Sequence, residues 1–133
     1  SACTTTLAIE PRTTDESVLY VMRVDAPASK DDVVTVLLNG REVTTLLPDE
    51  YKALYILPGS YEIKFIVTTP DGLKETATEF TEVIRPDDSK IAIIRYVMGW
   101  KDPRRFQDAR NLSVFSRMKD GGELDLTGRV EPN

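Results

Sequence analysis

Side chains that commonly carry enzyme chemistry are sparse in this sequence. It contains no histidine, which removes the usual general base near neutral pH and the commonest zinc ligand. Cys3 is the only cysteine, so the chain can form neither an internal disulfide nor a thiolate cage for zinc. Carboxylates remain, because the chain has 22 acidic residues against 17 basic ones. We therefore expect a protein that is not an enzyme, with no catalytic residue and no cofactor.

Aspartates in turn-like segments are the side chains that could hold a metal ion. Ca²⁺ takes roughly six to eight oxygen ligands, and Asp31, Asp49 and Asp71 lie in three separate segments of this kind. No Asp-x-Asp-x-Asp spacing accompanies them, and aspartate in a turn commonly bonds its own backbone. The sequence therefore predicts no metal site. A calcium- or carbohydrate-binding module is the alternative, with these three aspartates as the candidate calcium ligands.

Aromatic and basic residues alternate just after residue 99. Trp100 and Phe106 flank Arg104 and Arg105, and aromatic and arginine side chains dominate the energetics of protein interfaces. We predict that these four residues contact a partner; the alternative is that Trp100 closes the core and the arginines are solvated. The net charge of -5 argues against nucleic acid, whose phosphates attract clustered Lys and Arg. The expected partner is a protein rather than a nucleic acid or a small molecule.

Short apolar runs separated by turn residues must position these groups. A chain of 133 residues fits one domain. The expected strands lie at about 17–24, 33–38, 41–46, 52–57, 61–67, 74–83 and 90–98. This spacing predicts an all-β antiparallel sandwich of about seven strands, of the immunoglobulin or transthyretin type. Asn39-Gly40 predicts a type I′ hairpin, the Thr- and Glu-rich segment 74–83 an edge strand, and the apolar segment 90–98 a central one.

The chain is expected to have three parts, an N-terminal tether, a core and a C-terminal extension of the same domain. They span residues 1–16, 17–100 and 101–133. In the extension, Asp102-Pro103 could open a short helix, with aspartate as its N-cap, and the end of the chain reads as loosely docked. Antiparallel strands with short connections bring alternate loops to one end. Those loops are expected at 25–32, 48–50, 70–72 and 100–105.

Ser1-Ala2-Cys3 resembles the last three positions of a lipobox, the processing site of bacterial lipoprotein precursors. In that family the cysteine becomes the lipidated first residue, so the resemblance implies a lipid anchor on Cys3. The alternative is a free thiol at a frayed chain end. Thr4 is not the aspartate that retains such proteins at the inner membrane. The resemblance therefore implies an exported outer-membrane lipoprotein that faces the periplasm or the cell surface.

Three further segments resemble small bacterial lipoproteins that contain a domain of unknown function. The resemblance rests on a tyrosine-then-arginine first strand at 19–23, an Asn-Gly-Arg hairpin at 36–43 and a Pro-Gly-x-Tyr strand at 56–63. The last two also look like PEGA-type β modules of surface proteins. The resemblance covers about residues 18–98 and implies an envelope domain for protein binding or assembly, without catalytic residues. A lipoprotein subunit of a secretion system is a further alternative.

Overall fold

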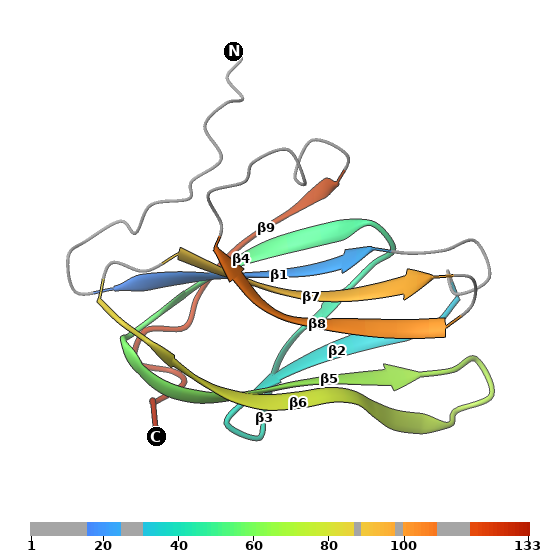
Figure 1. Cartoon of the computed structure of the whole chain (residues 1–133), viewed down its shortest axis with the longest axis horizontal. Coiled ribbons are helices and arrows are strands. Elements are labelled where there is room, and N and C mark those ends of the chain that lie inside the picture. Colours follow the sequence, from blue (N-terminus) through green and yellow to red (C-terminus); the bar gives the residue numbers. More distant parts are fainter. Residues whose placement is uncertain (1–15, 25–30, 87–88, 98–99, 109–117) are drawn as a thin grey trace, which may run out of the picture.

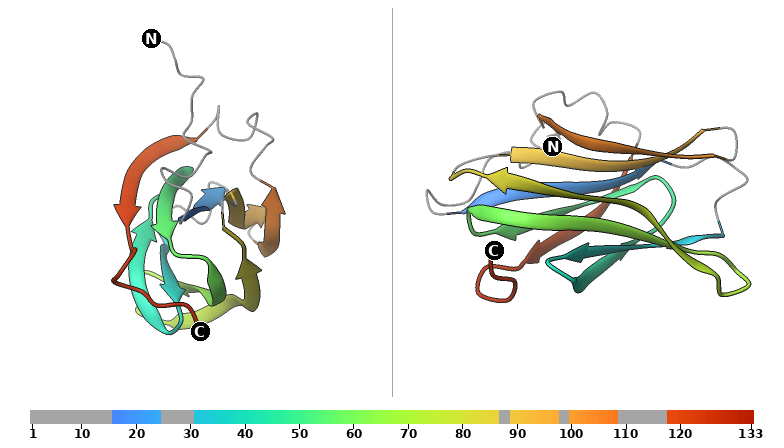
Figure 2. Two further views of the ribbon diagram at one scale, coloured as in Figure 1. Left: turned by 90° about the vertical axis from the view of Figure 1, so that its left-hand side faces the viewer. Right: turned by 60° about the horizontal axis from the view of Figure 1, so that its bottom comes forward.

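The computed structural model describes residues 16–24, 31–86, 89–97, 100–108 and 118–133, with the backbone alone at 78, 95–97 and 100–108. Within these residues the chain forms nine strands and no helix, and hence no helix that could span a membrane. The strands are β1 (Ser17–Val24), β2 (Val33–Leu38), β3 (Arg41–Leu46), β4 (Glu50–Ile56), β5 (Gly59–Thr68), β6 (Lys74–Ile84), β7 (Ser89–Val97), β8 (Trp100–Asp108) and β9 (Lys119–Asp125). They form two facing sheets (Figures 1 and 2).

The two sheets differ in the direction of their strands. Sheet A has the order β8-β7-β1-β4-β9, and sheet B has the order β3-β2-β5-β6. All described pairs of sheet B are antiparallel, whereas β1 runs parallel to β7 and β4 runs parallel to β9. The predicted all-β fold is confirmed and sheet B is antiparallel, but sheet A is mixed and the described residues form nine strands rather than about seven. Strand β6 ends where β1 begins, so β7 enters sheet A at that end and runs parallel to β1.

Several local predictions are confirmed, and one is wrong. Asn39 and Gly40 have φ of 52° and 79°, as a type I′ turn requires. Strand β6 is an edge of sheet B, and β7 lies inside sheet A. The helix expected at Asp102-Pro103 is instead part of β8. Pro103 is compatible with this strand because β8 is an edge of the described sheet. Backbone N–H groups on the outer side of an edge strand have no neighbouring strand to bind, so a proline there removes no hydrogen bond of the sheet.

The main core lies between the two sheets. Alternation along β5 turns Tyr61, Ile63, Phe65 and Val67 toward sheet A, and none of the four retains exposed surface. The hydroxyl of Tyr61 donates a hydrogen bond of 2.6 Å to the carbonyl of Leu57, four residues earlier. Burial raises the pKa of Tyr61 to about 12. This hydrogen bond fixes the connection by which the chain crosses from sheet A to sheet B.

The outward face of sheet A is also apolar. Its second buried cluster contains Val18, Tyr20, Met22, Tyr51, Ala53, Tyr55, Ile91 and Ile93. Val18, Tyr20 and Met22 alternate along β1 and share this face, which is not the face between the sheets. Arg23, on the opposite face of β1, points into the space between the sheets and is 1% exposed. Because β1 buries side chains on both faces, alternation along this strand does not by itself tell which face lies in the main core.

The C-terminal tail, residues 126–133, closes one end of the molecule, at the lower left of Figure 1. Leu126 and Val130 are buried in the main core. The Nδ2 group of Asn39 donates a hydrogen bond of 2.7 Å to the carbonyl of Glu131. The backbone N–H of Asn133 donates one of 2.8 Å to a carbonyl at the start of β5. The prediction of a loosely docked end is therefore wrong for this segment.

Candidate functional site

Strand directions bring several turns together at the end opposite the tail. Arg23 at the end of β1 pairs with Glu50 at the start of β4. In sheet B, Val33 pairs with Thr68 and Thr68 with Lys74, so the start of β2, the end of β5 and the start of β6 also meet. We call residues 31–33, 47–49 and 69–73 the loop end, which lies on the right in Figure 1. The prediction that the turns at 48–50 and 70–72 share one end is confirmed. Of the loop expected at 25–32 only residues 31 and 32 are described, and the segment expected as a loop at 100–105 belongs to β8.

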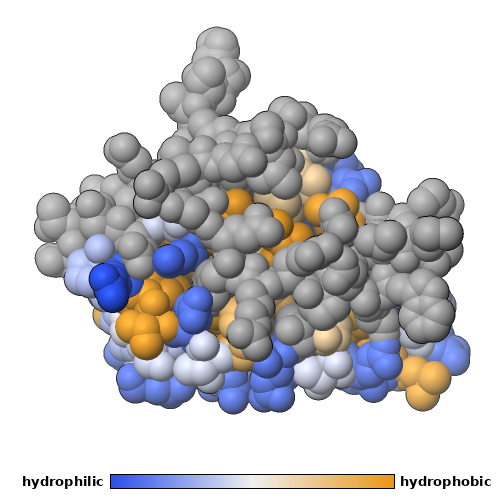
Figure 3. All heavy atoms as spheres, in the orientation of Figure 1, coloured by the Kyte–Doolittle hydropathy of each residue, from blue (hydrophilic) through white to orange (hydrophobic). Residues whose placement is uncertain are grey.

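Exposed apolar side chains concentrate at the loop end. Among the described residues, the exposed large hydrophobic side chains are Val33 (47%), Leu47 (58%), Leu73 (68%) and Val83 (65%). The first three belong to the loop end, and Val83 lies near the opposite end of β6. Figure 3 shows hydrophobic residues among hydrophilic ones at the right, where Figure 1 has the turn between β5 and β6. We call Val33, Leu47 and Leu73 the loop-end surface.

Register places two of these side chains side by side. Val34 pairs with Leu46, and both are buried in the core. Val33 and Leu47 directly adjoin this pair, so the two residues lie near each other at one end of β2 and β3. Leu73 lies two strands away, next to Lys74. The three residues therefore follow one end of sheet B rather than being scattered over the molecule.

Each residue of the loop-end surface has an aspartate within two positions, namely Asp32, Asp49 and Asp71. The hydroxyl of Thr69 donates a hydrogen bond to the Asp71 carboxylate. This bond, together with one from the N–H of Leu73, lowers the pKa of Asp71. The carboxylate is therefore ionised at neutral pH. Each exposed apolar residue thus has an acidic residue near it in the sequence.

The candidate calcium ligands Asp31, Asp49 and Asp71 share this end but do not converge. In the described ranges, no three or more acidic, cysteine or histidine side chains form a group that could hold a metal ion. Asp49 adopts a left-handed φ of 56°, and its carbonyl accepts a hydrogen bond of 2.7 Å from the N–H of Lys119. The three aspartates belong to different turns. What they share is the same edge of the molecule.

Two buried charged side chains hold the turn that presents Leu47. The guanidinium of Arg23 donates through Nη1 to the carbonyl of Leu46, at 2.9 Å. Oε1 of Glu50, which is 7% exposed, accepts the N–H of Leu47, also at 2.9 Å. The carbonyl and the N–H of the peptide group before Leu47 are thus both bound by side chains from sheet A. Both polar groups of the peptide that precedes the exposed Leu47 are therefore hydrogen-bonded.

Neighbouring strands add to this bracing. The ammonium group of Lys52 donates a hydrogen bond of 2.9 Å to the carbonyl of Thr45, just before the turn. On the other side of β4, Gly121 lies against the Glu50 side chain, where a Cβ would be 2.7 Å from the Glu50 Cδ. Glu50 is therefore enclosed by β9. The turn rests on β1, β4 and β9 together.

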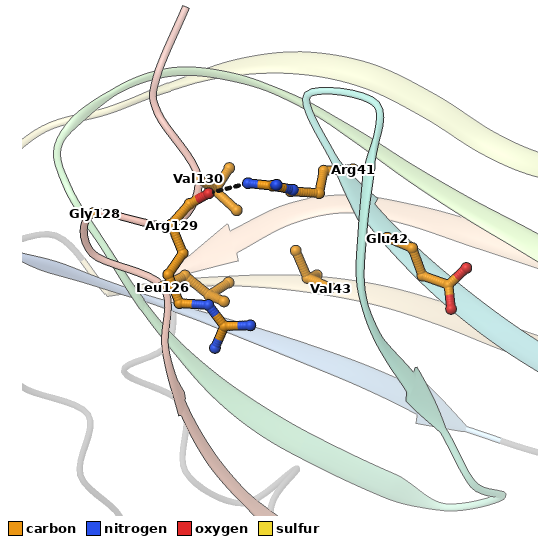
Figure 4. Close-up of a pocket in the computed structure, with 7 residues that line it drawn as sticks. All are labelled: Arg41, Glu42, Val43, Leu126, Gly128, Arg129 and Val130. Carbon is orange, nitrogen blue, oxygen red and sulfur yellow. Dashed lines mark hydrogen bonds between the residues drawn. The ribbon is translucent and has the colours of Figure 1, made fainter.

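A small pocket of about 280 Å³ lies at the tail end, between β3 and the tail (Figure 4). Its lining residues are Arg41, Glu42, Val43, Leu126, Gly128, Arg129 and Val130. The Arg41 guanidinium donates to the carbonyl of Arg129, and the Glu42 carboxylate points away from the pocket in Figure 4. Ligand pockets usually have about 300–1,000 Å³. We assign the pocket to the docking of the tail.

The predicted partner contacts Trp100, Arg104, Arg105 and Phe106 all belong to β8. Trp100 pairs with Val97, which puts the start of β8 at the loop end. Only the backbone of β8 is described, so the partner-binding role of these four side chains stays a prediction. Cys3 lies outside the described residues altogether, and the lipid anchor likewise stays a prediction.

Sequence reasoning missed Leu47. Part of the signal was present, because two successive leucines precede Pro48 and only one of two successive strand residues can face the core. A β-bulge in the pairing of β2 with β3 hides which of the two is exposed. An exposed leucine is ordinary by itself, so this signal gains weight only with the buried charges beneath it.

Comparisons of the chain with models of protein families, with curated proteins and with solved structures found no match. The chain is a small all-β protein with two sheets, and the resemblance to lipoprotein and PEGA-type modules stays a prediction.

Proposed function

We propose that this protein is a non-catalytic domain of the bacterial envelope that binds a partner protein through its loop-end surface. The observation that carries the proposal is Leu47, an apolar side chain 58% exposed on a turn that buried charges hold. Moving a fully exposed leucine side chain out of water is worth about 1.5–3 kcal/mol, and Leu47 still has 58% of its surface to cover. Apolar and conformationally fixed side chains are typical anchors of protein interfaces.

The proposed location rests on sequence. Ser1-Ala2-Cys3 supports a lipid anchor on Cys3 and an outer-membrane lipoprotein that faces the periplasm or the cell surface. An immunoglobulin-like sandwich is the fold type that we propose, supported by the Tyr61 hydroxyl bound to the Leu57 carbonyl between the sheets, a feature typical of that type. Trp100 at the start of β8 would extend the contact surface.

The partner that we propose carries apolar side chains next to cationic ones. Asp32, Asp49 and Asp71 accompany the three exposed apolar residues, and the whole chain has a net charge of -5. Complementary charge at the rim of an interface accelerates association and makes it sensitive to salt. The apolar contacts would supply most of the affinity, and the aspartates would select a basic partner over an acidic one.

Site-specific photocrosslinking in envelopes tests the location of the surface. A photoreactive residue at position 47 should give a protein adduct, whereas the same residue at position 83 should give none. Val83 is a matched control because its exposure is similar to that of Leu47 but it lies at the tail end, where it pairs with Ser60. Absence of an adduct at position 47, or the same adduct at both positions, contradicts the proposal.

Affinity for the purified adduct partner then measures the contribution of Leu47. We expect Leu47→Ser to weaken binding about tenfold or more, since about 1.4 kcal/mol corresponds to a factor of ten. Val83→Ser should change the affinity less than twofold. Equal effects of the two substitutions would mean that the loop end is not the binding surface.

Charge variants test the proposed chemistry of the partner. The triple variant Asp32→Asn, Asp49→Asn, Asp71→Asn should slow association and flatten its salt dependence. A control with the same net charge, Glu42→Gln, Glu62→Gln, Glu131→Gln, removes charges toward the tail end and should behave like wild type. An unchanged association rate in the first variant would exclude a cationic partner surface.

A further inference from the structure

The positions of Arg23 and Glu50 are unusual for charged residues. Both are nearly inaccessible, at 1% and 7% exposure, and they stand opposite each other on adjacent strands of sheet A. The alternation of β1 and β4 directs both side chains into the space between the sheets. Removing charges from water is costly, and replacing a buried charged pair by apolar residues is often neutral or stabilising. Stability of the core alone is therefore a weak reason for them.

One hydrogen bond of each side chain goes to the same peptide unit. Arg23 binds the carbonyl of Leu46, and Glu50 binds the N–H of Leu47. These two groups belong to the same peptide unit, so the pair fixes both of its ends. The next residues, Pro48 and Asp49, complete a turn in which Asp49 has the left-handed φ of 56°. A short turn with this backbone presents Leu47 in one direction as long as that peptide unit cannot rotate.

We infer that Arg23 and Glu50 are positioning residues of the loop-end surface, which lock the peptide before Leu47 so that its side chain is ordered before a partner arrives. Ordering a contact segment in advance lowers the entropy that binding must overcome. The inference rests on the proposed function for its purpose. The locking itself is a property of the protein alone and can be measured without a partner.

Amide hydrogen exchange of the full chain provides that measurement. In the double variant Arg23→Met, Glu50→Met no lone buried charge remains, and we expect the Leu47 amide to exchange about tenfold faster or more. Glu50→Gln retains an Oε1 acceptor and should keep exchange at Leu47 slow; because it leaves the Arg23 charge without the Glu50 charge, its free energy of unfolding is measured alongside. Glu42→Met, an exposed glutamate on β3, is the matched control and should have no effect.

The amide of Asn133, bound to the Ser60 carbonyl, reports whether the tail end of the fold is intact. Faster exchange at Leu47 with unchanged exchange at Asn133 supports positioning. Equal acceleration at both amides, or loss of folding, would show that the pair serves the fold itself and overturns the inference. Unchanged exchange at Leu47 overturns it as well.

Affinity measurements separate this inference from the proposed function. If both hold, the double variant binds the partner more weakly, Glu50→Gln binds like wild type, and Leu47→Ser loses binding. If Leu47→Ser loses binding but the double variant does not, the surface stands and the positioning role fails. If Leu47→Ser binds normally, the proposed function fails, whatever the exchange data show about the turn.

Discussion

The two ends of this protein are built in opposite ways. At the tail end, the chain covers its own core: Leu126 and Val130 are buried, and Asn39 is bound to the carbonyl of Glu131. At the loop end, Leu47 and Leu73 remain exposed on turns. Side chains bind backbone groups at both ends. At the tail end exposed side chains hold the chain's own terminus, and at the loop end buried side chains hold a turn whose leucine stays exposed.

Hydrogen bonds from side chains to the backbone thus serve different purposes at the two ends. A hydrogen bond that docks a tail contributes to folding, because it keeps apolar side chains away from water. The hydrogen bonds of Arg23 and Glu50 order a turn whose apolar side chain stays in water. Substitutions at the tail end should therefore change stability, and substitutions of exposed loop-end residues should change binding. The three predictions below test this division.

The largest effect on stability is expected from Gly59→Ala at the tail end. A Cβ at this position would lie 2.3 Å from the Cβ of Pro132, and φ is +148°, a region that alanine avoids. We expect a loss of about 3 kcal/mol in the free energy of unfolding, measured by urea denaturation. Gly40→Ala is the control, since it has φ of +79° but nothing within 4 Å of the new Cβ. Equal losses would mean that tail contact adds nothing.

A smaller effect is expected from Tyr61→Phe. The variant leaves the Leu57 carbonyl without its donor, which costs about 1 kcal/mol. Burial raises the pKa of Tyr61 from 10.0 to about 12. Between these values the unfolded chain loses the phenolic proton while the folded chain keeps it, so stability falls as the pH rises through this window.

Stability curves at pH 9 to 12 check this pH dependence. Tyr61→Phe should have a shallower alkaline decline than wild type. A residual decline is expected from Tyr20, because burial raises its pKa too. An identical alkaline slope in wild type and variant would mean that Tyr61 ionises freely in the folded protein.

Local sequence rules predicted much of the fold. The Asn39-Gly40 turn needs two positive φ angles, and this dipeptide tolerates them, so the hairpin was readable from two residues. Apolar and polar residues alternate along β5, and successive side chains of a strand point to opposite faces, so the sequence indicates which residues of β5 face the core. The bounds of β1, β2 and β3 also follow from such local patterns.

The rest depends on contacts between distant residues. The parallel pairing of β1 with β7 depends on the end of sheet A at which the chain re-enters it. Pro103 can belong to a strand because β8 lies at the edge of the described sheet. Docking of the tail depends on the space that Gly59 leaves for Pro132. The candidate site was hidden for a similar reason. Arg23 and Glu50 are charged and would be expected in solvent from the sequence alone, but the packing of β3 over sheet A and of β9 against Glu50 buries them.

The smallest effect on stability is expected where the proposed effect on binding is largest. Leu47→Ser removes a mostly exposed side chain whose backbone contacts do not depend on its chemistry, so the free energy of unfolding should change by less than about 0.5 kcal/mol. Val130→Ser, at a site 3% exposed, should lose several times as much in the same urea titration. A large loss at Leu47 would identify it as part of the core and remove the contrast between the two ends, because its exposure would then have no functional meaning.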